Sequence, residues 1–234
     1  SDEAFGSATT LWTSAAIAKA TLVAGYKVVE FVLPWEVERY VREWLPVFLT
    51  RRLVGRNPHV RVNIFDFFSG PGRDPQGNPG SPLIVQEEIK SFCRTQAALK
   101  ADVSIRMFFN DIAPDHVSRL RATLQESRCP KNCCRYEFSS LPFELALESQ
   151  LPSMKPRDAA NLVILDQCGV TEVTPDTVKA LVDCGATDIM FFLSTSFLRR
   201  FAAEPEMQSK FDIDPNLAKI EENDTMHRYI CQYF

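Results

Sequence analysis

Apolar runs and helical patterns alternate along most of the chain. Short apolar runs bounded by Gly, Pro or Asp are typical of buried strands in a parallel sheet. Such runs occupy residues 59–68, 103–110, 136–138, 161–166 and 188–193. Apolar positions three and four residues apart predict helices over residues 82–99, 114–126, 143–150, 174–184 and 197–203.

This alternation predicts the fold class. A strand, a helix and a second strand form a right-handed unit whose strands run parallel in one sheet. Residues 56–234 are therefore predicted to form a doubly wound, mostly parallel, Rossmann-like α/β domain. The segment from Trp12 to about Leu53 is rich in helical patterns, with Pro34 suited to the first turn of a helix. Residues 1–55 are predicted to form a helical N-terminal extension.

Composition narrows the class of protein. The formal net charge of −4 argues against a basic nucleic-acid-binding surface as the main feature of the domain. The seven cysteines form an odd number, and the sequence shows neither a signal peptide nor an apolar run of membrane-spanning length. These features predict a reduced, cytoplasmic protein without a membrane partner. The apolar end at Tyr233-Phe234 leads us to expect a further domain after it.

Polar and turn-forming residues follow four of the predicted strands. Ligands of doubly wound sheets bind outside the carboxyl ends of the strands, which line up along one edge. The first strand ends at Asp66 and breaks into a turn of Gly, Pro and Gly, where a ligand can approach bare backbone. Acids also end the second and fourth of these strands, at Asp111 and Asp166.

An adenosine-containing ligand suits this arrangement. Glycines admit it to the backbone, an acid after the second strand accepts the ribose hydroxyls, and the loop after the third strand flanks the adenine. For Asp111, capping of the following helix is the alternative. The predicted cofactor-binding residues are Asp66, Ser69, Gly70, Pro71, Gly72, Asp111, Ile112, Ser140 and Leu141.

Two segments resemble motifs of S-adenosylmethionine-dependent methyltransferases. Residues 108–115, Phe-Phe-Asn-Asp-Ile-Ala-Pro-Asp, resemble the motif at their second strand. Residues 138–143, Phe-Ser-Ser-Leu-Pro-Phe, resemble the motif at their third strand. The resemblance implies a methyltransferase-like domain with S-adenosylmethionine as its cofactor.

A longer string resembles one family in particular. Residues 67–84, Phe-Phe-Ser-Gly-Pro-Gly-Arg-Asp-Pro-Gln-Gly-Asn-Pro-Gly-Ser-Pro-Leu-Ile, look like the signature of the three-Cys-motif partner family of bacteria and phages. Residues 40–46 and 165–169 resemble that family too, and the likeness spans about residues 12–201. It implies a methyltransferase-like α/β domain with a helical lead-in and, in many members, a C-terminal winged helix that is not visible here.

The resemblance implies two functions. One is S-adenosylmethionine-dependent methylation of a nucleic-acid base or nucleotide, with nucleic acid bound through a region not present here. The alternative is a non-catalytic partner or regulatory subunit of a nucleic-acid modification or defence system. Two departures from the family favour the alternative. Lys27 is followed by Val28 instead of His, and Gln167-Cys168 replaces a proline and an aromatic residue.

Candidate substrate-side residues come from three loops. Asp166, with Gln167 beside it, is the candidate catalytic group, because a carboxylate at a strand end can take a proton or hold a substrate amine. Capping of the next turn is its alternative. Arg73 is predicted to contact substrate or pair with Asp74, and Ser194-Thr195 to contact substrate or cap a helix.

The cysteines suggest no metal site. Cys168 invites comparison with thiolate nucleophiles, but a small buried side chain is the favoured interpretation. Cys129, Cys133 and Cys134 follow no spacing typical of zinc or iron–sulfur ligands. No metal is predicted.

Overall fold

The computed structural model describes residues 20–23, 26–30, 34–54, 61–95, 104–127, 134–167, 172–191 and 205. Their strands form one seven-stranded sheet of order β1-β2-β7-β6-β3-β4-β5. All neighbouring strands are parallel except β1 and β2, which are antiparallel. The bounds are β1 (Ala20–Val23), β2 (Tyr26–Glu30), β3 (Arg61–Asp66), β4 (Ser104–Asn110), β5 (Cys134–Ser139), β6 (Ala159–Leu165) and β7 (Thr187–Phe191).

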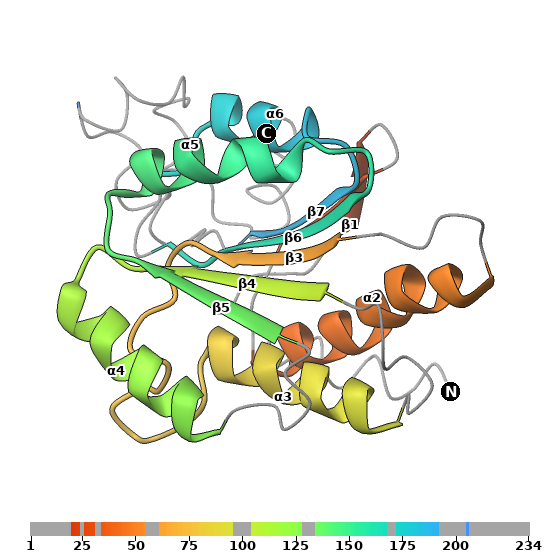
Figure 1. Ribbon diagram of the computed structural model, residues 1–234. Helices are drawn as coiled ribbons and strands as arrows, with labels where there is room; N and C mark the ends of the chain where they lie inside the picture. The colour runs from red at the N-terminus through yellow and green to blue at the C-terminus, as the bar shows by residue number, and fades with distance from the viewer. Residues whose placement is uncertain are drawn as a thin grey trace, which may run out of the picture.

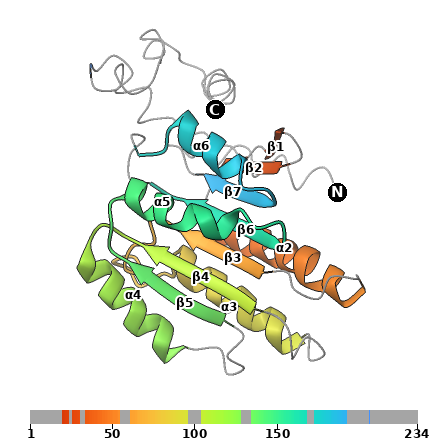
Figure 2. The same ribbon diagram turned by 45° about the horizontal axis from the view of Figure 1, so that its top comes forward.

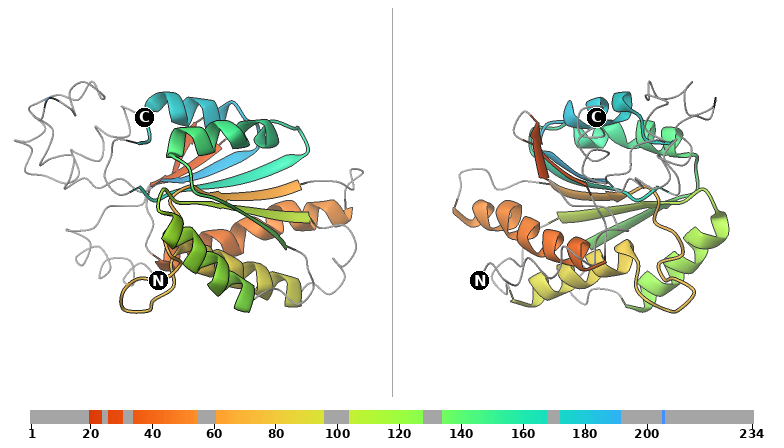
Figure 3. Two further views of the ribbon diagram at one scale, coloured as in Figure 1. Left: turned by 60° about the vertical axis from the view of Figure 1, so that its left-hand side comes forward. Right: turned by 180° about the vertical axis from the view of Figure 1, so that it is seen from behind.

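Helices cover both faces of this sheet. One face carries α2 (Pro34–Val54), α3 (Ser81–Thr95) and α4 (Pro114–Glu126), and the other carries α5 (Phe143–Met154) and α6 (Pro175–Val182) (Figure 1). The side view in Figure 3 shows the three layers. Each face has its own buried apolar cluster, so the strands between them are buried from both sides. No helix of the described ranges is long and apolar enough to cross a membrane.

Strands β3 to β7 confirm the predicted fold class. Taken by themselves they have the order β7-β6-β3-β4-β5, and their arrows run in one direction (Figure 2). The chain leaves β3 toward β4 and β5, then returns to the other side of β3 with β6 and β7. The order therefore reverses between β3 and β6. In doubly wound folds, ligands bind at this reversal, outside the carboxyl ends of the strands.

A line of buried polar side chains fixes the register of the central strands. Asn63 Nδ2 donates to Asn161 Oδ1 at 2.9 Å, joining β3 to β6. Asn161 Nδ2 donates to Thr187 Oγ1 at 3.0 Å, joining β6 to β7. Because an unpaired buried amide is costly, a register slip would be strongly disfavoured. The carboxyl ends of the three strands are thereby aligned.

The N-terminal extension differs from the prediction. Residues 1–55 were predicted to be helical, but within the described part only 34–54 form a helix. Residues 20–23 and 26–30 form β1 and β2, and β2 pairs with β7. The physical reason is that the helical spacing comes from residues 37–45, whereas Val28-Val29 belongs to a β-branched stretch that suits a sheet. The helix predicted at 197–203 lies outside the described residues.

The loop between β3 and α3 packs against α4 through a glycine. Gly72 has φ +83°, and a Cβ built on it would lie 2.7 Å from Leu120 Cδ1. Leu120 is fully buried, so it has little room to move. Gly77, farther along the same loop, has φ +87° but nothing within 4 Å of such a Cβ. Glycine is therefore required at position 72 for two reasons, the positive φ of the backbone and the close contact with Leu120.

These two glycines form a matched pair for a stability measurement. Gly72→Ala and Gly77→Ala share the left-handed backbone cost of about 1–2 kcal/mol. We expect Gly72→Ala to lower the free energy of unfolding by a further ~1–3 kcal/mol, because Leu120 must repack. Urea denaturation of both variants measures the difference. Equal losses would mean that the loop does not pack on α4 as described.

Candidate functional site

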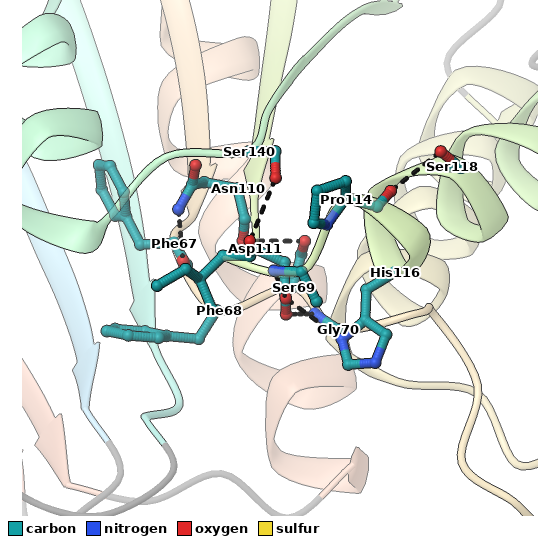
Figure 4. Close-up of polar contacts among 12 residues, drawn as sticks. Phe67, Phe68, Ser69, Gly70, Asn110, Asp111, Pro114, His116, Ser118 and Ser140 are labelled. Carbon is teal, nitrogen blue, oxygen red and sulfur yellow. Dashed lines mark hydrogen bonds and ion pairs between the residues drawn. The ribbon is translucent and has the colours of Figure 1, made fainter.

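The candidate site lies at the carboxyl ends of β3, β4 and β5, where the glycine turn meets the acid after β4. The backbone N–H of Gly70 donates to Asp111 Oδ2 at 3.0 Å (Figure 4). Gly70 has φ +57°, and a Cβ built there would meet nothing within 4 Å. The structure thus brings together the turn and the carboxylate that the sequence predicted to share a site, and leaves space at Gly70.

The buried side chain of Asn110 holds the three strand ends together. Its Nδ2 donates to the carbonyl of Phe67 at 3.2 Å and to the carbonyl of Leu141 at 3.0 Å. Its Oδ1 accepts from the Leu141 N–H at 3.1 Å. The Asn110 carbonyl accepts from both the N–H and the Oγ of Ser69, at 2.9 and 3.0 Å. The loops after β3 and β5 are therefore fixed on the last residue of β4.

The Asp111 carboxylate is almost fully used by protein donors. Besides Gly70 on Oδ2, its Oδ1 accepts from the N–H of Ala113 at 2.8 Å and lies 3.1 Å from His116 Nδ1. The capping alternative finds no support, because α4 has no side-chain cap hydrogen bond at its N-cap, Ala113. Asp111 instead ties the glycine turn to the loop that leads into α4. About one of its four acceptor positions remains free.

Exposed apolar side chains flank this carboxylate. Ile112 is 72% exposed, and Leu141, on the loop after β5, is 38% exposed. Ser140 Oγ donates to the Ile112 carbonyl at 3.3 Å, so the two loops are adjacent. A large apolar side chain that is exposed to water beside a polar group indicates a candidate ligand site, because the polar group can orient a ligand that covers the apolar side chain. Both residues were predicted to bind the cofactor, and Leu141 lies in the loop that was predicted to flank the adenine.

Asp66 braces the base of the glycine loop. It is buried, and its Oδ2 accepts from Ser81 Oγ, at the start of α3, at 2.6 Å. Its Oδ1 accepts from the Phe68 N–H at 3.3 Å. Burial raises the pKa of Asp66 to about 7, and the negative charges of Asp166 and Asp111 add to the rise. Asp66 thus closes the loop, and its contact with a cofactor stays a prediction.

The two predicted catalytic residues differ in position. Asp166 is exposed after β6, yet the surrounding protein desolvates it enough to raise its pKa above the ordinary value. Gln167 is buried, and its Oε1 accepts from the N–H groups of Glu172 and Val173, both at 3.1 Å. Gln167 therefore orders the loop before α6, while Asp166 is free to meet a ligand.

The remaining candidates are partly described. Arg73 is exposed, and its Nη1 donates to the Gly77 carbonyl at 2.8 Å, while Asp74 binds Asn78. Arg73 and Asp74 therefore have different hydrogen-bond partners and do not form the ion pair that was the alternative prediction. Pro71 is half-buried beside Gly72. Residues 168, 194, 195, 129 and 133 lie outside the described part. Among the described side chains, no group of three or more His, Cys, Asp or Glu could hold a metal ion.

Sequence reasoning missed two residues of this site. Asn110 lies at the end of a strand predicted from the sequence, and no role was predicted for His116. The signal for His116 lay in its spacing: it follows Asp111 by five residues and sits in the first turn of a helix opened by Pro114. No protein-family model matches the chain, and no curated protein matches it.

The buried carboxyl of Asp66 predicts a pH dependence of stability. Its pKa is about 7 in the folded protein, against 3.8 for the free group. A raised pKa in the folded state means that stability falls as pH rises through this interval, by up to about 4 kcal/mol. Urea denaturation between pH 4 and pH 8 should show that this fall is absent in Asp66→Asn. Parallel curves for the two proteins would contradict the placement of Asp66.

Proposed function

We propose that this protein binds S-adenosylmethionine and is a methyltransferase-like protein. The observation that carries the proposal is the Gly70–Asp111 hydrogen bond beside the exposed Ile112. It joins the glycine turn of the first parallel strand to the acid after the second, with an apolar side chain left in water. Glycine turn, ribose acceptor and adenine contact are the three parts that an adenosyl ligand requires at such an edge.

The negative charge of the residues at this site also suits S-adenosylmethionine, which carries a positive sulfonium. Asp66, Asp111 and Asp166 lie at the carboxyl ends of three neighbouring strands, and the negative charges of Asp166 and Asp111 help to raise the pKa of Asp66. A negative edge favours a cationic sulfonium over a phosphate-bearing nucleotide. The glycine loop also lacks the Gly-Lys-Ser/Thr sequence of a phosphate-binding loop. Both features favour S-adenosylmethionine over a dinucleotide or a nucleoside triphosphate.

In the enzymatic form of the proposal, Asp166 serves the substrate. When bound, the cofactor supplies a methyl group on a strongly electrophilic sulfonium. Asp166 lies beside the reversal of strand order, where it can hold a substrate amine or take its proton. Its raised pKa makes it a better base than an ordinary aspartate. By resemblance, we propose a nucleic-acid base or nucleotide as the substrate.

A non-catalytic partner is the second candidate, and the position of Gln167 favours it. Amino-group methyltransferases that act on bases carry a Pro-Pro-aromatic turn after this strand. Here the Gln167 side chain points into the protein and holds backbone of the following loop. The substrate-facing part of that turn is therefore replaced. The resemblance to the three-Cys-motif partner family, a cytoplasmic location and a protein or nucleic-acid partner belong to the same proposal.

Calorimetric titration with S-adenosylmethionine and S-adenosylhomocysteine tests the ligand. Asp111→Asn should weaken binding about ten- to a hundredfold, because a charge-assisted hydrogen bond contributes roughly 1.5–3 kcal/mol. Asp115→Asn is the matched control, because this exposed acid lies four residues later in the same segment. Thermal denaturation of both variants separates lost binding from lost folding.

Three outcomes of these measurements are informative. Absence of binding at millimolar ligand would contradict the proposal outright. Where the ligand binds, methyl transfer to nucleic acid that is lost in Asp166→Asn would identify an enzyme. Binding without transfer to any nucleic acid or nucleotide would favour the non-catalytic partner.

A further inference from the structure

A buried acid at the base of the glycine loop has no counter-ion. Asp66 is 1% exposed, and both groups that donate to its carboxylate, the Ser81 hydroxyl and the Phe68 N–H, are neutral. No ion pair among the described residues includes Asp66. Buried carboxylates are normally paired with a cation, because an isolated buried charge is costly. Asp66 therefore lacks the partner that its ionised form requires.

The charged groups around Asp66 add to this cost. Asp166, after β6, and Asp111, after β4, both act on Asp66 with negative charge. His116, on α4, can carry a positive charge, but it faces Asp111 and is 43% exposed. Arg73, in the glycine loop, is exposed and is hydrogen-bonded within that loop. Solvent screens both of these cations. The protein thus supplies negative charge to Asp66 and little positive charge.

Asp66 is consequently able to change its charge near neutral pH. Burial raises the pKa of its carboxyl to about 7 from the ordinary value of 3.8, and the charges of Asp166 and Asp111 add to the rise. A cation bound at this edge would favour the ionised form of Asp66. Because such coupling is reciprocal, the ionised form of Asp66 would also favour binding of the cation.

We propose that the missing counter-ion of Asp66 is the positive charge of the bound methyl donor, and that Asp66 selects this donor against its neutral product. S-adenosylmethionine carries a sulfonium, whereas S-adenosylhomocysteine carries an uncharged thioether in the same place. Asp66 acts across the glycine turn, so the selection requires charge but no direct contact. This inference rests on the proposed adenosyl ligand and adds a specificity-determining residue to it.

The inference fixes the direction of a pH dependence. A bound cation lowers the pKa of Asp66, so a proton leaves as the methyl donor binds. The affinity for S-adenosylmethionine should therefore rise about tenfold between pH 5.5 and pH 8, the effect of a fall of about one in that pKa. The affinity for S-adenosylhomocysteine should change much less. The ratio of the two affinities, measured by calorimetry, removes the effects that both ligands share.

Three substitutions identify the group that responds. Asp66→Asn keeps an acceptor for the Phe68 N–H but cannot ionise, so its affinity ratio should stay constant with pH. Asp115→Asn is the matched control, because it removes an exposed acid in the first turn of α4, and it should keep the wild-type profile. His116→Gln removes the other group that can titrate in this range, and it should also keep the profile.

A measurement on the wild-type protein does not depend on the folding of any variant. Calorimetric titrations at pH 7, in buffers of different ionisation enthalpy, report the number of protons exchanged on binding. S-adenosylmethionine should release about 0.4 proton more than S-adenosylhomocysteine, given a pKa of about 7 that falls by about one. Equal proton release with the two ligands would overturn the inference.

The outcomes distinguish this inference from the proposed function. If both ligands bind with a ratio that does not vary with pH, Asp66 only braces the loop, and the inference is wrong although the adenosyl site stands. If the ratio varies in Asp66→Asn as in the wild-type protein, or becomes constant in His116→Gln, another group responds to the ligand and the inference is again wrong alone. If the protein binds neither ligand, both proposals fail.

Discussion

The arrangement of the site depends on one buried amide. Asn110 is 1% exposed, and its side chain bonds to the carbonyl of Phe67 and to both backbone groups of Leu141. Leaving a buried polar group unpaired costs about 1–3 kcal/mol. The Asn110 amide therefore strongly favours the loop positions in which Phe67 and Leu141 supply its hydrogen-bond partners. The ends of β3, β4 and β5 therefore behave as one unit. Asp111 and Ile112 directly follow Asn110 in the chain, so the hydrogen bonds of Asn110 also position these two residues.

The charges at this edge follow from the same constraint. Parallel strands in register bring Asp66, Asp111 and Asp166 to one edge, where the negative charges of Asp166 and Asp111 add to the rise in the pKa of Asp66. Asp66 is the most buried of the three, and its pKa rises to about 7. Asp111 is held by protein N–H groups, and Asp166 reaches solvent. Three acids of similar sequence context thus differ in position: Asp66 braces a loop, Asp111 is the proposed ligand acceptor, and Asp166 is the candidate base.

Much of the architecture was predictable, because hydrophobic periodicity reports burial directly. The helix predicted at 114–126 has the same bounds in the structure, and the strand predicted at 103–110 begins one residue later. The parallel order followed from the alternation of strands and helices. The strands at 20–30 were missed because helical spacing nearby was extended over a β-branched stretch.

The site was predictable only to the level of strand ends. Topology alone brings Gly70 and Asp111 to one edge, and the structure agrees. Side-chain direction is not encoded in that pattern. Gln167 turns inward, Gly72 packs on Leu120, and Asn110 looks like any polar residue at the end of a strand. His116 joins the site because the first turn of α4 brings it back to Asp111, a geometry that depends on where the helix begins.

Amide hydrogen exchange in the free protein tests the central claim most directly. If Asn110 and Asp111 hold the loops as one unit, the amides of Ser69, Gly70 and Leu141 should open together. They should then show a common free energy of opening, close to that of β4. Rapid, unprotected exchange at Gly70 or Leu141, with β4 still protected, would contradict the account.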